Sequence, residues 1–451
     1  MAQSTDLTTG SITKKLLAVA TPIMGSQLVQ MTYNLTDMFW LGQTKESTLM
    51  LAASGLGGMF MWLSMALMTF GRMGAEIGVS QSVGRGETTE AERYACAAVR
   101  IALYLGLLFG GALMAFTPMW IGLFGVREPE VHQAAVSYLR IAAIGIPLTY
   151  VSAAVTGVFN GAGNTRLTFI CNAVGMVLNM ILDPLMIIVW GWGIAGAAIA
   201  TVIGQAAVCV LFMVCVRKHG QRPLPGFRFR GRMERTNAVQ ILRWAWPTAL
   251  ENGAFTLLAM SVTNMVAQYS ASAITVQRIG SQIESLSWLI GGGFGTAVTA
   301  FVGQNFGARR FDRIRAGFRT SLTWLCCWQA FVTFVLFFFG GTLYKAFSGD
   351  VNIQMMGSTY LKILCSCVIF GAFEGVCAGS FRGMGQTLPA SICSIGGNLV
   401  RPVLCWVLSR QMGLNGLWWG VAISAMLRGV TVAIWYMVAA RQMPTRAPVE
   451  V

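Results

Sequence analysis

The segment "CNAVGMVLNMILDPLMIIVW", Cys171–Trp190, decides the fold class of this chain. Its length matches the roughly 20 predominantly apolar residues that an α-helix needs to cross a bilayer core. It nevertheless contains Asn172, Asn179 and Asp183. A carboxylate costs about 2.5–3.5 kcal/mol at the centre of an inserted helix. The sequence therefore predicts a membrane helix whose polar residues have a structural or functional role.

Asn179 and Asp183 are four residues apart, so they share one face of that helix. Pro184 follows and has no N–H, which leaves the carbonyl of Met180 without its usual helical partner. A group of oxygen ligands that face one way suits a small hard cation or a carried proton. The alternative is a structural Asn/Asp pair that joins two helices by hydrogen bonds.

A second carboxylate, Asp37, lies in the first apolar segment and has no basic residue within two helical turns. It must therefore be protonated, bound to a cation or paired across helices. Two such acids near the beginning of one chain suggest a single site.

The composition indicates an integral membrane protein, since 55% of the 451 residues are hydrophobic and only 11% are charged. The net charge of +15 does not indicate nucleic-acid binding, because Lys and Arg cluster between apolar segments as the positive-inside rule predicts. The cysteines lie mostly inside apolar stretches, which indicates reduced core residues. With only His132 and His219, a histidine zinc site is not expected.

Apolar segments of spanning length number about twelve and lie in two groups of six. The predicted organisation is a cytoplasmic leader (1–13), an N-lobe (14–216), a cytoplasmic linker (217–236), a C-lobe (237–440) and a cytoplasmic tail (441–451). An even number of spans places both termini on one side, and the Arg-rich loops make that side cytoplasmic. The linker is expected to be solvated near anionic headgroups.

The two groups of segments repeat each other. "QSVGRG" at Gln81–Gly86 recurs as "QNFGAR" at Gln304–Arg309, and "FNGAGNTRLTFIC" at Phe159–Cys171 recurs as "FRGMGQTLPASIC" at Phe381–Cys393. The spacing indicates a duplicated six-helix unit. Because six is even, both copies insert the same way round, which predicts an all-α protein of twelve helices in two pseudo-symmetric lobes around a central cavity.

The copies differ in charge, because Asn179 corresponds to Arg401 and Asp183 to Cys405. The acidic cluster therefore exists only in the first half. We expect Arg401 to act as a fixed cation that replaces a mobile one in the second half, paired with Glu251 or Glu374.

The strings "LNMILDPLMI" and "GIAGAAIATVIGQ", the "QSVGRG" and "FNGAGNT" turns and the duplication resemble the multidrug and toxic compound extrusion (MATE) family over nearly the whole chain. The acids of helices one and five are most similar to the bacterial DinF-type and NorM-type branches. The resemblance implies an antiporter that exports small organic, often cationic amphipathic compounds, driven by Na⁺ or H⁺. The residues alone leave the choice between these two ions open.

Site residues follow from the resemblance position by position. It implies a cation site formed by Asp37, Asn179, Asp183 and Thr201, with Tyr33 and Asn34 at its edge. Pro22 matches the proline at which helix one bends in some members, and Pro184 is a second expected bend. Met176, Glu251, Glu374 and Arg401 are expected to line the substrate cavity, although a methionine is equally common in an ordinary apolar helix.

Three functions compete. The leading one is a cation-coupled exporter. The second is a flippase for lipid-linked precursors, which would need a more basic cavity to hold pyrophosphate. A membrane enzyme is disfavoured because no nucleophile–base constellation is found. We expect a monomer without a cofactor, in a bacterial plasma membrane, whose partners are the lipid bilayer and small organic molecules rather than nucleic acid.

Overall fold

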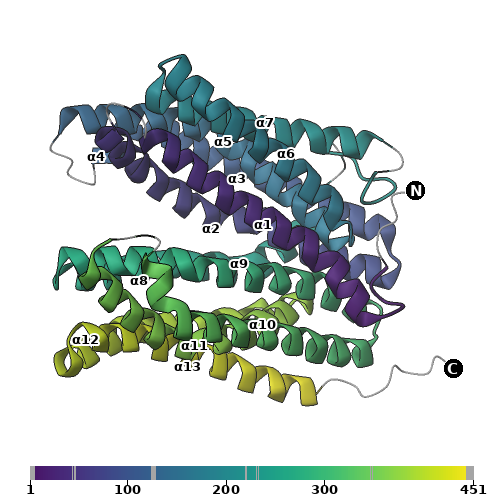
Figure 1. Ribbon diagram of the computed structural model, residues 1–451. Helices are drawn as coiled ribbons and strands as arrows, with labels where there is room; N and C mark the ends of the chain where they lie inside the picture. Colours follow the sequence, from purple (N-terminus) through teal and green to yellow (C-terminus); the bar gives the residue numbers. More distant parts are fainter. Residues whose placement is uncertain are drawn as a thin grey trace. The chain divides into compact units, whose positions relative to one another are not determined.

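The computed structural model describes residues 6–42, 44, 47–122, 128–218, 221–229, 231, 233–345, 347 and 349–442 (Figure 1). Its helices are α1 (Ile12–Gly42), α2 (Ser47–Arg85), α3 (Thr88–Ala115), α4 (Thr117–Gly122), α5 (Pro129–Gly161), α6 (Thr165–Pro184), the π-helical η1 (Leu185–Val189), α7 (Gly193–Arg217), α8 (Arg235–Ala267), α9 (Ala271–Gly307), α10 (Phe311–Lys345), α11 (Val351–Gly383), α12 (Thr387–Met412) and α13 (Leu414–Arg441).

Twelve of these helices, all the α-helices except α4, contain 20 residues or more. Within the described ranges, ten of the twelve are long and apolar enough to cross a membrane, and α1 and α8 are the two outside that group. The prediction of an all-α membrane protein built from twelve long helices is confirmed.

The chain divides into two compact units, whose boundaries lie inside helices. Unit 1 contains Thr21–Ala249, and unit 2 contains Leu7–Ala20 together with residues 250–442. One boundary therefore lies beside Pro22 in α1 and the other close to Pro247 in α8. As a result, unit 2 includes the first turns of α1, and unit 1 includes the linker and the first turns of α8.

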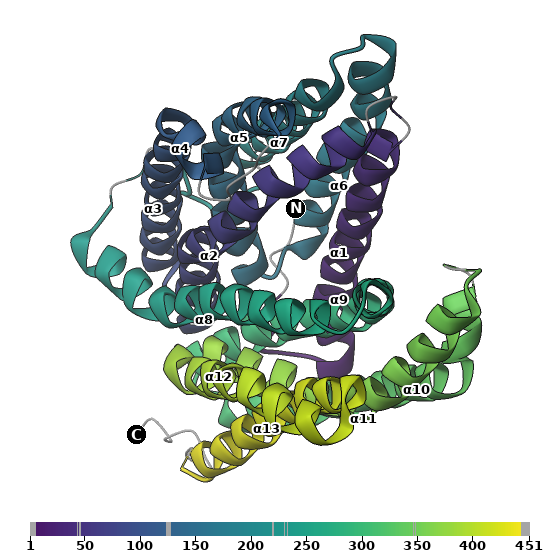
Figure 2. The same ribbon diagram turned by 90° about the vertical axis from the view of Figure 1, so that its left-hand side faces the viewer.

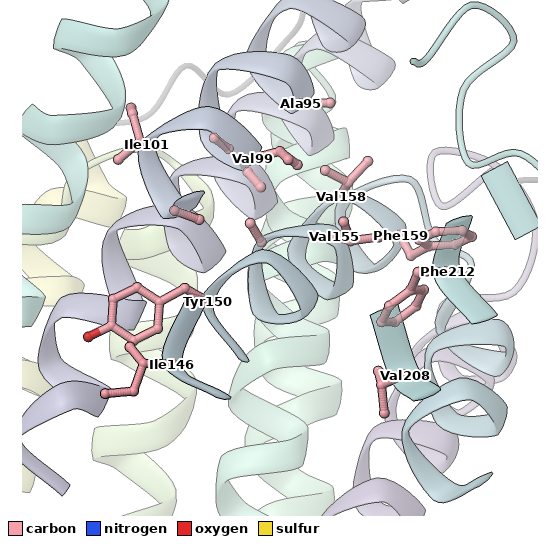
Figure 3. Packing of buried hydrophobic residues seen from close by; sticks show 14 of the residues in the cluster. Ala95, Val99, Ile101, Ile146, Tyr150, Val155, Val158, Phe159, Val208 and Phe212 are labelled. Atoms are coloured by element: carbon pink, nitrogen blue, oxygen red, sulfur yellow. The ribbon is translucent and has the colours of Figure 1, made fainter. Parts of the chain in front are cut away.

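In unit 1, α5 is the central helix and packs against α2, α3 and α7. Figure 3 shows the buried side chains at its centre. The rings of Phe159 and Phe212 lie 5.7 Å apart and join α5 to α7. Tyr150 is fully buried and its hydroxyl donates to the carbonyl of Ser64 at 2.8 Å, which ties α5 to α2. These contacts place α7, which carries Thr201, against the centre of the unit.

In unit 2, α11 has the corresponding central place, packed against α9, α10 and α13, with α12 beside α13 (Figure 2). One close approach repeats between the units. A Cβ on Gly161 of α5 would lie 2.8 Å from the carbonyl oxygen of Glu76 on α2, and a Cβ on Gly383 of α11 would lie 2.7 Å from that of Thr299 on α9. Only glycine permits this backbone contact. The shared contact supports the predicted duplication.

The sequence predicts a solvated linker, but the structure buries part of it. Leu224 and Phe227 are buried, with 3% and 0% of their surface exposed, and the N–H of Gly226 donates to the carboxylate of Glu92 on α3. The prediction of a solvated linker is wrong for these residues, because the apolar side chains between the arginines pack against unit 1. His219, Arg230 and Arg232 lie outside the described residues.

The leader also packs closely, in this case within unit 2. Leu7 is fully buried, and its N–H donates to Oε1 of Gln304 at 3.0 Å. The guanidinium of Arg313 donates to the carbonyls of Leu7 and Gly10 at 3.3 and 2.9 Å. The end of α9 and the beginning of α10 therefore hold the segment that precedes α1. Residues 1–5 of the leader and 443–451 of the tail lie outside the described part.

Candidate functional site

The polar residues of α6 lie against α7 in unit 1. Gly175 and Gly204 let the two helices approach closely, since a Cβ on Gly204 would lie 2.9 Å from the carbonyl oxygen of Gly175 and 3.2 Å from Cβ of Asn179. Asn179 and Asp183 are consequently buried, with 3% and 0% of their surface exposed. Neither carboxylate oxygen of Asp183 has a hydrogen-bond partner in the part of the chain that the structure describes.

Thr201 of α7 connects three helices. Its hydroxyl donates to the carbonyl of Ala197 at 3.0 Å. Because a hydroxyl has one proton, the same oxygen must accept the two remaining contacts: one from Nδ2 of Asn179 at 3.4 Å and one from the phenol of Tyr33 at 3.4 Å. Thr201 thereby holds Nδ2 of Asn179 and links Tyr33 of α1 to α6 and α7 through one hydroxyl oxygen.

Asp37 lies one helical turn beyond Tyr33 and is half-buried. Its Oδ1 atom is buried without a partner among the described residues. Asp37 and Asp183 lie close enough to interact electrostatically. The structure therefore brings the two carboxylates, Asn179, Thr201 and Tyr33 together within one unit.

Two further polar residues were not identified from the sequence. Gln205 follows Thr201 by one turn on α7, and its Oε1 is buried without a partner in the described ranges and lies against Gly145 of α5; the four-residue spacing was a signal that could have found it. Tyr138 of α5 lies within electrostatic range of both Asp37 and Asp183. No local pattern could have found Tyr138, because its position depends on how α5 packs.

The cluster contains buried oxygen atoms that can accept hydrogen bonds but have no donor among the described residues. Buried atoms of the cluster without a described partner are Oδ1 of Asp37, Oδ1 of Asn179, and Oδ1 and Oδ2 of Asp183. Each buried acceptor left without a donor costs about 1–3 kcal/mol. A proton on a carboxylate or a Na⁺ among these oxygens would remove that cost, so the residues present fit either ion.

The remaining predicted residues of unit 1 lie on α1 and α6, and some of them are distant from the two acids. Asn34 is exposed and its Oδ1 accepts a hydrogen bond from Gln30 at 3.2 Å, on the surface of α1. Met176 is half-buried on α6, three residues before Asn179. After Pro184 the helix continues as the π-helical η1, a form that often marks functional sites. The carbonyl of Pro22 accepts from the hydroxyl of Ser26 at 3.1 Å.

In unit 2 the two acids predicted to line the cavity, Glu251 and Glu374, have direct partners. Glu251 accepts from Arg382 at 3.5 Å and from the hydroxyl of Ser391 at 2.9 Å. Glu374 forms an ion pair with Arg428 at 3.2 Å. The expected pairing of Arg401 with one of these acids was therefore wrong, because two other arginines lie closer to them. Arg401 instead donates from Nε to the hydroxyl of Ser424 at 2.9 Å.

A sequence model of the MatE family matches residues 22–185 and 247–407 of this chain. The chain belongs to the MatE family. The resemblance to multidrug and toxic compound extrusion transporters is thereby confirmed, and each of the two matched ranges covers most of one sequence repeat. The ranges contain Asp37, Asn179 and Asp183 in the first repeat and Arg401 in the second.

Curated relatives of this MatE protein match along almost their entire length. "Probable multidrug resistance protein NorM" of Thermotoga maritima is 26% identical over 436 residues, which cover 94% of this chain and 92% of that protein. "Probable multidrug resistance protein YpnP" of Bacillus subtilis is 24% identical over 96% of both chains. "Multidrug export protein MepA" of Staphylococcus aureus is 22% identical over 92% of this chain and 91% of that protein.

Solved structures show the same fold. A crystal structure of MATE in complex with MaD3S has a TM-score of 0.91 at 19% identity, over 97% of this chain and 98% of that chain. An outward-facing multidrug resistance MATE transporter of the MOP superfamily also has a TM-score of 0.91, at 20% identity, over 98% of both chains. At this identity the similarity establishes the MatE fold alone.

Proposed function

We propose that this MatE-family transporter exports small organic, often cationic amphipathic compounds in exchange for H⁺ or Na⁺. The observation that supports it is the cluster of buried oxygen acceptors around Asp37 and Asp183, beside which the described residues place no basic side chain. Relatives are named for multidrug resistance and multidrug export, which supports organic compounds as the cargo. The protein belongs in a bacterial plasma membrane, acts there as a monomer and has both termini in the cytoplasm.

Coupling follows from competition for the same charge. When Asp37 and Asp183 are ionised, they attract a cationic compound. When they hold a proton or Na⁺, that charge is cancelled and the attraction weakens. An exchange of this kind is a coupling free energy between two ligands, and it biases the alternating access of the transporter.

The membrane potential contributes to the exchange when net positive charge moves inward. One net elementary charge that moves inward through 100 mV releases about 2.3 kcal/mol, which corresponds to a concentration ratio of roughly 50-fold for an exported compound without net charge. Export of a monovalent cation for one ion moves no net charge, so it depends on the concentration gradient of the coupling ion or on a second coupling ion. The flippase alternative is less favoured, because the acidic cluster of unit 1 would repel a pyrophosphate group. The MatE family is a family of transporters, so an enzymatic activity is not proposed.

The test is transport in proteoliposomes with imposed Na⁺ or pH gradients and ethidium as the cargo. We expect wild-type protein to move ethidium against its gradient, and Asp37→Asn and Asp183→Asn to lose at least nine-tenths of that rate, about 1.4 kcal/mol in the coupling step. Asp312→Asn is the matched control, because Asp312 is an exposed acid at the beginning of α10, 77% accessible in its side chain. Full transport by both site variants would refute the assignment.

A further inference from the structure

The second sequence repeat rebuilds the unit 1 cluster with the opposite charge. In unit 1, Asn179 of α6 donates to the hydroxyl of Thr201 on α7. In unit 2, Arg401 of α12 donates to the hydroxyl of Ser424 on α13. These residues correspond in the two repeats, and Cys405 stands where Asp183 would be. Both repeats therefore contain this hydrogen bond, but the second has the guanidinium of Arg401 in place of the amide of Asn179 and the thiol of Cys405 in place of the carboxylate of Asp183.

Arg401 is a buried cation whose bonding capacity is mostly unused. It is 8% exposed, and its one hydrogen bond among the described residues is from Nε to Ser424. A guanidinium has five N–H donors. Within the described ranges, no carboxylate oxygen lies within 4.0 Å of it, since Glu251 pairs with Arg382 and Glu374 with Arg428. Glu284 and Glu374 lie within electrostatic range of Arg401, although Glu374 already forms its ion pair with Arg428.

Asn398 supplies a second, independent observation. It lies three residues before Arg401 on α12, which places both on the same face. Asn398 is 1% exposed, and both its Nδ2 and its Oδ1 atoms are buried without a partner in the described part of the chain. A buried amide in this state is costly, about 1–3 kcal/mol for each unpaired group. Such a group is expected to be satisfied by a ligand.

Arg428 of α13 adds a second positive charge close to Arg401 and Asn398. A Cβ on Gly397 would collide with the Arg428 side chain, so Arg428 packs directly against the backbone of α12 at this glycine. Arg428 is 5% exposed, and its Nε is buried without a partner among described residues although its Nη1 contacts Glu374. The donors of Arg401, Asn398 and Arg428 therefore gather along the contact between α12 and α13.

We infer that Arg401 and Asn398 form a binding site in unit 2 for a carboxylate group of the exported compound. A planar guanidinium matches a carboxylate, and the Asn398 amide donates a further hydrogen bond to it. This inference rests on the proposed export of organic compounds, and it adds to the cargo those molecules that carry an acid beside a base or an aromatic body.

The test compares rhodamine B, which has a free carboxylate, with its ethyl ester, which has none. Binding of each dye to the purified full-length protein is measured by fluorescence polarisation at neutral pH. We expect wild-type protein to bind the acid about tenfold more tightly than Arg401→Gln does, because a charge-assisted hydrogen bond is lost. Ester affinity should change less than twofold, which separates loss of the site from a general loss of binding.

Three further variants keep the result interpretable. Asn398→Leu removes only an unsatisfied amide, so the protein should fold and should lose roughly threefold in affinity for the acid alone. Arg401→Lys keeps the charge and should recover part of the affinity. Arg410→Gln is the matched control on the same helix, because Arg410 is exposed and stacks on Trp406 at 3.9 Å. It should leave both affinities unchanged.

The proposal is overturned if folded Arg401→Gln and Asn398→Leu both bind the acid as wild type does. It is also overturned if the acid and the ester lose affinity equally in both variants. Each of these results could occur while wild-type protein still exports ethidium under an ion gradient, in which case export stands without the carboxylate site. Absence of gradient-driven ethidium export would instead refute the proposed function.

Discussion

At the scale of single residues, the two repeats deal with buried charge in different ways. In unit 1, Asp183 is fully buried and both its oxygens lack a partner among the described residues. In unit 2, Glu374 and Arg428 neutralise each other at 3.2 Å. A buried ion is costly unless it is paired, so an unpaired acid such as Asp183 calls for a mobile ion. This difference is why we place coupling in unit 1.

Thr201 is predicted to position the coupling site without touching the ion. Thr201→Val keeps the shape of the side chain and removes the oxygen that accepts from Asn179 and Tyr33. We expect the apparent affinity for the coupling ion to fall about three- to tenfold, equivalent to one neutral hydrogen bond, with little change in the maximal rate. The measurement is the ethidium efflux rate against Na⁺ concentration and against pH.

The control for this prediction is Thr149→Val. Thr149 of α5 also donates to the carbonyl of its own preceding turn, that of Gly145 at 3.0 Å. The Thr149→Val variant therefore loses the same kind of intrahelical hydrogen bond as the Thr201→Val variant. Equal ion dependence in the two variants would mean that Thr201 has only a structural role.

At the scale of helices, close glycine contacts fix how each unit is built. The backbone of α5 meets that of α2 at Gly161, and the backbone of α11 meets that of α9 at Gly383. In a bilayer, helices associate through packing and not through exclusion from water, and small residues permit the closest packing. These two contacts hold α5 and α11 at the centre of their units.

Gly161→Ala and Gly383→Ala are each predicted to destabilise the protein. The added Cβ would lie 2.8 or 2.7 Å from a backbone oxygen, which must move. Overpacking of this kind costs about 1–3 kcal/mol. We expect a lower Tm for both variants by fluorescence-detected size-exclusion after heating in detergent.

Gly111→Ala provides the comparison on α3. A Cβ there has nothing within 4 Å, so the variant gains helix propensity without a clash. Its Tm should be unchanged or slightly raised, since alanine is favoured over glycine in helices by about 1 kcal/mol. A Tm for Gly161→Ala equal to that of Gly111→Ala would show that the α2–α5 contact is looser than described.

At the scale of the whole molecule, the distribution of arginines predicts the orientation in the membrane. Arg85 lies at the end of α2, Arg309 and Arg310 precede α10, and Arg217 and Arg222 lie at the linker. These connections are predicted to face the cytoplasm, because short cytoplasmic loops hold an excess of positive charge. The connection between α10 and α11, which contains Gly349, is predicted to face outward.

Reporter fusions measure this orientation. Green fluorescent protein joined after Val451 should fluoresce, because it folds in the cytoplasm, and alkaline phosphatase at the same place should be inactive. Alkaline phosphatase joined after Gly349 should be active, since that site follows α10 on the opposite side. The reverse pattern would invert the predicted topology and with it the direction of transport.

The sequence by itself determined the class of protein, the twelve long helices, the duplication and the positions of the buried acids. The bilayer explains this success, because each crossing needs a long apolar helix and an acid inside one is conspicuous. The shared face of Asn179 and Asp183 likewise followed from helical periodicity alone.

The tertiary structure alone decided which helix faces meet. Tyr138 reaches the two acids from α5, Arg382 and not Arg401 pairs with Glu251, and Phe227 of the linker is buried. Helices that are apolar on all sides carry little periodic signal of the face they bury. The partner of a buried charge lies on a helix far away in sequence, so only the packing of helices settles it.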